Sequence, residues 1–94
     1  MEQINCKIGV VGLGYVGFPL ARLMATRYDT VAFDCDGERV KTLKKGVDVT
    51  GELSAEEMEL LLNNDRFSIT SEVDDLRGCN VYLVAVPTPV DVDN

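Results

Sequence analysis

Short apolar runs alternate along this chain with stretches in which apolar residues recur every three or four positions. Four runs, at residues 6–11, 30–33, 67–70 and 81–86, have the length and composition of β-strands. The run at 81–86 is apolar at every position, which is typical of a parallel strand covered on both faces. The pattern therefore predicts four strands.

The stretches between these runs predict helices over about residues 15–27, 37–45 and from 55 onward, and one or two helical turns at 71–76. Gly46 ends the second helix, and Ser54 with Glu57 has the spacing of a capping box that begins the third. The residues expected to face the core are Val16, Leu20, Leu23 and Met24 in the first helix, Val40, Leu43 and Val47 in the second, and Ala55, Met58, Leu61 and Leu62 in the third.

Strands separated by helices imply parallel pairing with right-handed crossovers. The fold class is therefore α/β, an open parallel sheet of about four strands with helices on both faces. If the fold is a partial Rossmann fold, the strand order is 3-2-1-4.

Composition narrows the class of partner. The chain has 94 residues, enough for one small domain, and a formal charge of −7, which argues against a nucleic-acid or anionic-membrane surface. Its longest uncharged stretch, residues 8–21, is too short and too rich in glycine to span a bilayer, and no signal peptide precedes it, so we expect a cytoplasmic protein.

Histidine is absent, so His-based triads and histidine-containing zinc sites are excluded, and no metal site is expected. The three cysteines, Cys6, Cys35 and Cys79, form no CxxC pair. They are most simply interpreted as buried small apolar residues, with a reactive thiol as the alternative.

The chemistry-bearing motif is G-x-G-x-x-G, formed by Gly12, Gly14 and Gly17 directly after the first strand. Gly12 permits a tight turn, Gly14 lets a pyrophosphate approach the backbone, and Gly17 lets the helix pack close to the strand. The free amides of Tyr15 and Val16 would face the pyrophosphate. A merely structural strand–helix turn is the alternative.

Asp34 ends the second strand, 22 residues after Gly12, where the motif places an acid that binds the adenosine ribose hydroxyls. Its charge would repel a 2′-phosphate and favours NAD over NADP, whereas nearby Arg39 could attract one. Asp36 competes for the acid role, but its place past the strand suggests a helix cap. FAD or S-adenosylmethionine remain alternative adenosine ligands.

Thr88 lies in Val-Pro-Thr-Pro, residues 86–89, at the end of the last strand. Ligands of open α/β sheets sit outside the carboxyl ends of the strands, at the switch point, which places Thr88 near the middle of a dinucleotide. An ordinary loop is equally compatible with the spacing.

These motifs resemble the opening of the UDP-glucose/GDP-mannose dehydrogenase family. The likeness runs through residues 7–21, 32–34, 46–52 and 84–91, nearly the whole chain. Within the family, the chain looks most like dehydrogenases of UDP-N-acetylhexosamines that supply uronic acids for bacterial polysaccharides.

The resemblance implies oxidation of a sugar C6 alcohol to a carboxylate with reduction of two NAD. NAD contacts carry over to Val16, Asp34, Arg39 and Thr88. Phe18 stands where leucine is more usual.

Family members use a cysteine nucleophile far downstream, and none of the three cysteines here matches its context. We therefore expect residues 1–94 to be an N-terminal NAD-binding domain without catalytic residues, truncated before the second mononucleotide half and the catalytic domain. UDP-sugar recognition is then confined to the full-length enzyme. A sheet truncated in this way would expose strand edges and apolar helix faces, so we expect a homo-oligomer. A free-standing NAD-binding or sensor module is the alternative.

Overall fold

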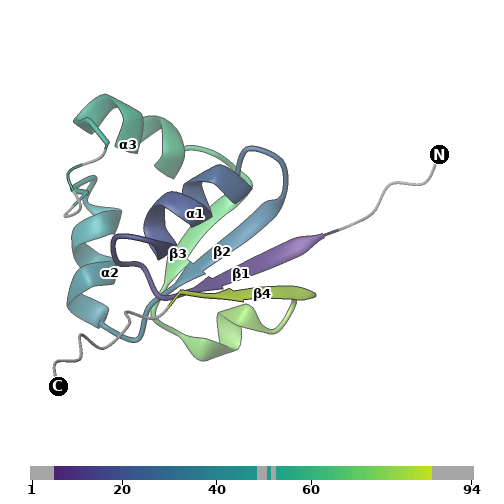
Figure 1. Cartoon of the computed structure of the whole chain (residues 1–94). Coiled ribbons are helices and arrows are strands. Elements are labelled where there is room, and N and C mark those ends of the chain that lie inside the picture. The colour runs from purple at the N-terminus through teal and green to yellow at the C-terminus, as the bar shows by residue number, and fades with distance from the viewer. Residues whose placement is uncertain (1–5, 49–50, 52, 86–94) are drawn as a thin grey trace, which may run out of the picture.

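A computed structural model describes residues 6–48, 51 and 53–85 (Figure 1). In chain order its elements are β1 (Lys7–Val11), α1 (Gly17–Met24), β2 (Asp29–Phe33), α2 (Gly37–Lys44), α3 (Ala55–Leu62), β3 (Phe67–Thr70), the 3-10 helix η1 (Val73–Leu76) and β4 (Val81–Val84). Each predicted strand and helix is present, with bounds that differ by at most three residues where both are described.

The four strands form one parallel sheet in the order β3-β2-β1-β4, which confirms the predicted topology. The register aligns Val10 with Ala32 on one side and with Leu83 on the other. Because parallel strands point the same way, the ends of β1, β2 and β4 that follow Val11, Phe33 and Val84 lie at one edge of the sheet (Figure 1).

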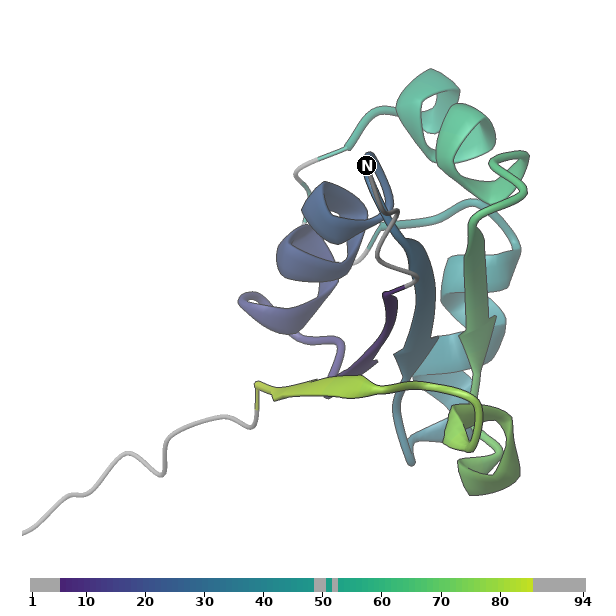
Figure 2. The same cartoon turned by 90° about the vertical axis from the view of Figure 1, so that its right-hand side faces the viewer.

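The three α-helices contribute to a single apolar core on one face of the sheet, built around Ile8, Val10, Ala32 and Ile69. The other face is covered by η1 and the residues after it, where Leu76, Tyr82 and Cys79 lie over Gly9. Figure 2 shows α1 and η1 on opposite sides of the strands. Helices therefore lie on both faces, and among the described residues the second face is covered by the short 3-10 helix η1 and the segment after it.

The buried face of α1 differs from the prediction. Gly17, Phe18 and Ala21 are buried in the helix, as is Ala25 just after it, whereas Val16 and Leu23 are 70% and 60% exposed. Leu20 and Met24 are only half-buried. The reason is steric: a stripe of glycine and alanine four residues apart lets the helix lie close to the sheet, with Phe18 packed beside the stripe, and Val16 and Leu23 lie on the side that faces away.

Other expected core positions are also outside. Val47 lies past the end of α2 and is exposed, as is Ala55 in the first turn of α3. Of the cysteines, only Cys79 is buried, whereas Cys6 is half-buried and Cys35 is exposed. Cys35 lies two residues beyond the end of β2, directly after Asp34.

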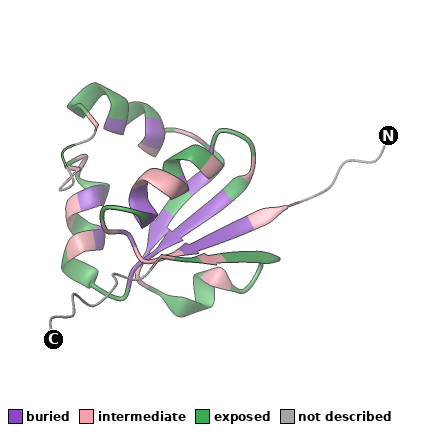
Figure 3. Cartoon of the chain, in the orientation of Figure 1, coloured by how far each residue is buried: buried purple, intermediate pink, exposed green. Residues whose placement is uncertain are grey.

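β4 is the largest departure from expectation, because Val81, Tyr82 and Val84 are all exposed. Among the described residues no strand pairs with its outer edge, and Figure 3 shows burial concentrated on the other strands. A continuously apolar sequence thus does not mean that both faces are covered in this chain. No helix in the described ranges is long and apolar enough to cross a bilayer.

The caps at the start of α2 and α3 are formed by the residues that the sequence predicts. Ser54 Oγ accepts from the Glu57 amide at 3.1 Å, and the Glu57 carboxylate accepts from the Ser54 amide at 2.9 Å, which completes the predicted capping box. Asp36 caps α2, as expected of the acid beyond the strand end, by accepting from the amides of Glu38 and Arg39. α2 is thereby fixed where its first turn faces the end of β2.

Candidate functional site

The glycine loop, residues 12–16, leaves β1 between the ends of its two neighbouring strands. The Gly12 amide donates to the Phe33 carbonyl at 2.8 Å, and the Ala85 amide donates to the Val11 carbonyl at 2.8 Å. The loop therefore begins between β2 and β4, at the switch point of the sheet, where open α/β folds bind ligands.

Gly12 and Gly17 shape the turn. Gly12 has φ +103°, a backbone conformation that side chains disfavour. A Cβ on Gly17 would lie 1.5 Å from the Gly12 carbonyl oxygen and 3.2 Å from the Ala85 Cβ. The first helical residue thus packs directly on the backbone of the loop, as the motif predicts.

Gly14 differs from both, because the space beside it is open. A Cβ there would have one neighbour within 4 Å, the Arg39 Nη1 atom at 3.9 Å. The φ of Gly14 is not positive, so nothing within the described residues requires a glycine at this position. A group that approaches the backbone closely is the remaining reason for one, and the predicted pyrophosphate is such a group.

The start of α1 offers donors beside this space. The first helical bond runs from the Phe18 amide to the Gly14 carbonyl at 3.2 Å, and Val16, at the N-cap, makes no side-chain cap. Within the described residues, the amides of Tyr15, Val16 and Gly17 have no protein acceptor. Unpaired amides at a helix N-terminus favour an anion such as phosphate.

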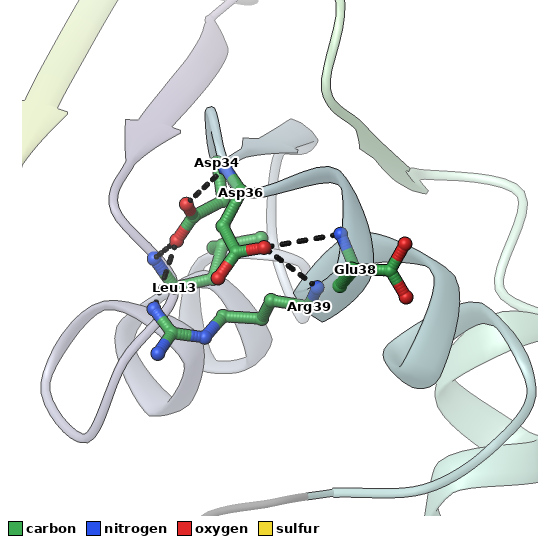
Figure 4. A network of polar contacts seen from close by, with 5 residues as sticks. All are labelled: Leu13, Asp34, Asp36, Glu38 and Arg39. Atoms are coloured by element: carbon green, nitrogen blue, oxygen red, sulfur yellow. Dashed lines mark hydrogen bonds and ion pairs between the residues drawn. The ribbon is translucent and has the colours of Figure 1, made fainter.

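Asp34 lies at the centre of a polar network next to the loop (Figure 4). Its Oδ2 accepts from the Leu13 amide at 2.8 Å and from the Arg39 guanidinium at 3.2 Å. Its Oδ1 accepts from the Asp36 amide at 2.8 Å. With 7% of the residue exposed, Asp34 is a buried carboxylate that joins the glycine loop, the end of β2 and α2.

The network keeps this carboxylate ionised. Burial raises the pKa of Asp34, but the hydrogen bonds from the amides of Asp36 and Leu13 lower it. The Arg39 guanidinium lowers the pKa further, and the net result is a pKa below the ordinary value of 3.8. Asp34 is therefore an anionic acceptor at neutral pH.

The predicted site residues thus converge at one place. Gly12, Gly14, Tyr15, Val16 and Gly17 form the loop and the start of α1, and Asp34 and Arg39 lie beside them. Thr88 lies outside the described residues. The residue that sequence reasoning missed is Leu13, whose amide binds Asp34, and no feature of the motif points to that bond.

The donor and acceptor set fits a dinucleotide. Unpaired amides suit a pyrophosphate, the open space at Gly14 admits it, and an ionised carboxylate at the end of β2 suits ribose hydroxyls. Tyr15 and Val16, 76% and 70% exposed, leave the amides at this end of α1 accessible.

Comparison with known proteins agrees with this geometry. Residues 6–94 match the profile described as "UDP-glucose/GDP-mannose dehydrogenase family, NAD binding domain". The UDP-N-acetyl-D-glucosamine 6-dehydrogenase of Pseudomonas aeruginosa is 42% identical over 87 residues, which cover 93% of this chain and 20% of that protein. The match confirms the resemblance predicted from the motifs, with NAD as the cofactor.

Solved structures give the same fold. The UDP-D-ManNAc dehydrogenase of Pyrococcus horikoshii superposes with a TM-score of 0.78 and 32% identity over 90% of this chain and 21% of that one. The GDP-mannose dehydrogenase of Pseudomonas aeruginosa superposes with a TM-score of 0.77 over 89% of this chain and 20% of that one, and its 23% identity supports the fold alone. The chain spans about a fifth of the length of the curated relatives it matches.

Proposed function

Because this chain belongs to the UDP-glucose/GDP-mannose dehydrogenase family and carries its NAD-binding domain, we propose that the glycine loop, Asp34 and Arg39 bind the adenosine diphosphate half of NAD. The observation that supports this best is the open space at Gly14, flanked by unpaired amides and a buried carboxylate. The amides of Tyr15 and Val16 would hold the pyrophosphate. Asp34 and Arg39 would hold the adenosine ribose, and Thr88 would contact the nicotinamide half.

The same residues favour NAD over NADP. Asp34 is ionised and buried, so a 2′-phosphate on the ribose would meet a negative charge at short range. Arg39 offsets part of that charge through its 3.2 Å ion pair. The balance still favours the diol, because the carboxylate can accept from a hydroxyl and cannot accept from a phosphate.

We further propose that the protein to which this domain belongs oxidises the C6 alcohol of a UDP-N-acetylhexosamine to a carboxylate. NAD accepts a hydride twice, once from the alcohol and once at the aldehyde stage, and water supplies the second oxygen of the carboxylate. The sugar-binding and catalytic groups lie outside this domain in that proposal. The product would serve polysaccharide precursor synthesis in the cytoplasm, and the enzyme would be a homo-oligomer.

Cofactor binding is tested on residues 1–94 by following amide resonances of a ¹⁵N-labelled chain during titration with NAD. Shifts should be largest for residues 14–17 and for Asp34, and NADP should bind more weakly. The Asp34→Ala variant should lose most of the NAD response. No shift at residues 14–17 with millimolar NAD would contradict the proposal.

The activity is tested on the complete gene product. With a UDP-N-acetylhexosamine and NAD it should form two NADH per sugar, with the sugar recovered as the uronic acid. One NADH per sugar would contradict the four-electron oxidation while leaving NAD binding intact.

A further inference from the structure

We propose that Asp34 positions the glycine loop as well as binding ribose: its carboxylate holds Leu13, and with it Gly12 and Gly14, in the conformation that receives the pyrophosphate. That the loop receives a pyrophosphate rests on the proposed function. That Asp34 orders the loop is independent of the proposed function, because this ordering is measured without cofactor.

The bond between Leu13 and Asp34 is placed to have this effect. Leu13 lies between two glycines, the residue type with the greatest backbone freedom, and its amide donates to Asp34 Oδ2 at 2.8 Å. The Leu13 side chain is completely buried in the core. The loop is therefore held at its middle by two attachments, one apolar and one polar.

The carboxylate that holds Leu13 is itself held. The Asp36 amide donates to its Oδ1 and the Arg39 guanidinium to its Oδ2, and 8% of the Asp34 side chain is exposed. A carboxylate has about four lone-pair positions, and these three donors leave one of them for a ribose hydroxyl. Binding ribose therefore does not require Asp34 to release Leu13.

A role confined to ribose predicts something different. If Asp34 acted only as a ribose ligand, its loss would leave the affinity for a ligand without ribose unchanged. Inorganic pyrophosphate is such a ligand, and it carries the group that the loop amides would bind. Its affinity therefore separates the two roles.

The experiment compares Asp34→Ala with Asp36→Asn in the 94-residue chain. Each variant removes one carboxylate charge near the start of α2, so the loss of a negative charge is common to both. The Asp36→Asn variant keeps a good N-cap for α2, because asparagine caps helices about as well as aspartate. Alanine at position 34 leaves the Leu13 amide without its acceptor, whereas an asparagine could keep an oxygen toward Leu13 and turn its NH₂ group toward the Asp36 amide.

Hydrogen exchange of the Leu13 amide is measured without ligand, and pyrophosphate affinity by resonance titration. We expect Asp34→Ala to exchange this amide at least about tenfold faster than Asp36→Asn, and to bind pyrophosphate about fivefold or more weakly. Equal pyrophosphate affinities in the two variants would overturn the inference, whatever the exchange rates.

A second measurement needs no substitution. In the wild-type chain, acidification should shift the Leu13 amide resonance with the same midpoint as the Asp34 carboxyl carbon. A Leu13 resonance that does not follow the Asp34 titration would overturn the inference even if Asp34→Ala failed to fold. A wild-type chain that bound neither pyrophosphate nor NAD would contradict the proposed function instead, and the Leu13 titration would still decide whether Asp34 holds the loop.

Discussion

Replacing Gly17 with alanine tests the contact between α1 and the glycine loop. The new Cβ would lie 1.5 Å from the Gly12 carbonyl oxygen and 2.7 Å from its carbon, whereas real Cβ atoms essentially never approach closer than 3.0 Å. The Cβ and the oxygen must therefore separate by at least a further 1.5 Å. The obstructing atoms belong to backbone, so no side chain can rotate to relieve the overlap.

The expected loss of stability in Gly17→Ala follows from the part of the structure that must move to relieve the overlap. α1 can withdraw only by loosening Phe18 and Ala21, which are 1% and 0% exposed in the core. Overpacking of this kind costs about 3 kcal/mol or more when the clash is backbone against backbone. In a domain of this size that corresponds to a fall in Tm of about 12 °C or more.

Thermal and urea unfolding followed by circular dichroism measure this effect. Gly37→Ala is the matched control, because a Cβ on Gly37 meets nothing within 4 Å and its φ is not positive. That variant should be as stable as the wild type or more stable by up to about 1 kcal/mol. A Gly17→Ala protein whose Tm lies within about 4 °C of the Gly37→Ala protein would refute the packing explanation.

Three further outcomes are expected. Gly14→Ala should keep the wild-type Tm, because its Cβ meets only an Arg39 atom at 3.9 Å, yet bind NAD more weakly in a resonance titration. The stability that Asp34 contributes should be complete above its ordinary pKa of 3.8 and be lost as the pH falls through the lower folded-state pKa, so the difference in urea midpoint between wild type and Asp34→Asn should shrink at acid pH. Ser54→Ala should cost about 1 kcal/mol in urea unfolding through loss of the capping box, and Ser54→Asn should restore most of it.

Most of the fold could be predicted from local patterns in the sequence. The capping box and the position of Asp34 follow from features within a few residues. The strand order follows from the same local patterns once the glycine motif identifies a Rossmann-like fold. The prediction of the buried face of α1 was wrong because hydrophobic periodicity gives most weight to large apolar side chains and overlooks glycine and alanine. Once Gly17 is assigned to the sheet side, Ala21 and Ala25 share its face, and this rule would have found the correct stripe.

Tertiary context decided the rest. Whether the apolar residues of β4 are covered depends on what lies beyond the strand, and its own sequence holds no information about that. The Leu13–Asp34 bond joins positions 21 residues apart, and a main-chain donor has no signature in the sequence. The site could therefore be located from the motif, but the hydrogen bonds within it could be identified only from the three-dimensional structure.

The pairing of β1 ties the cofactor site to segments that are far apart in the sequence. β1 pairs with β2 across 22 residues, Lys7 with Asp29, and with β4 across 73, Ile8 with Val81. As a direct closure from β1, the longer loop costs about 1 kcal/mol more in chain entropy. The docking of β4 brings Ala85 against Gly17. The glycine turn near the start of the sequence is therefore enclosed by a strand that begins only at Val81.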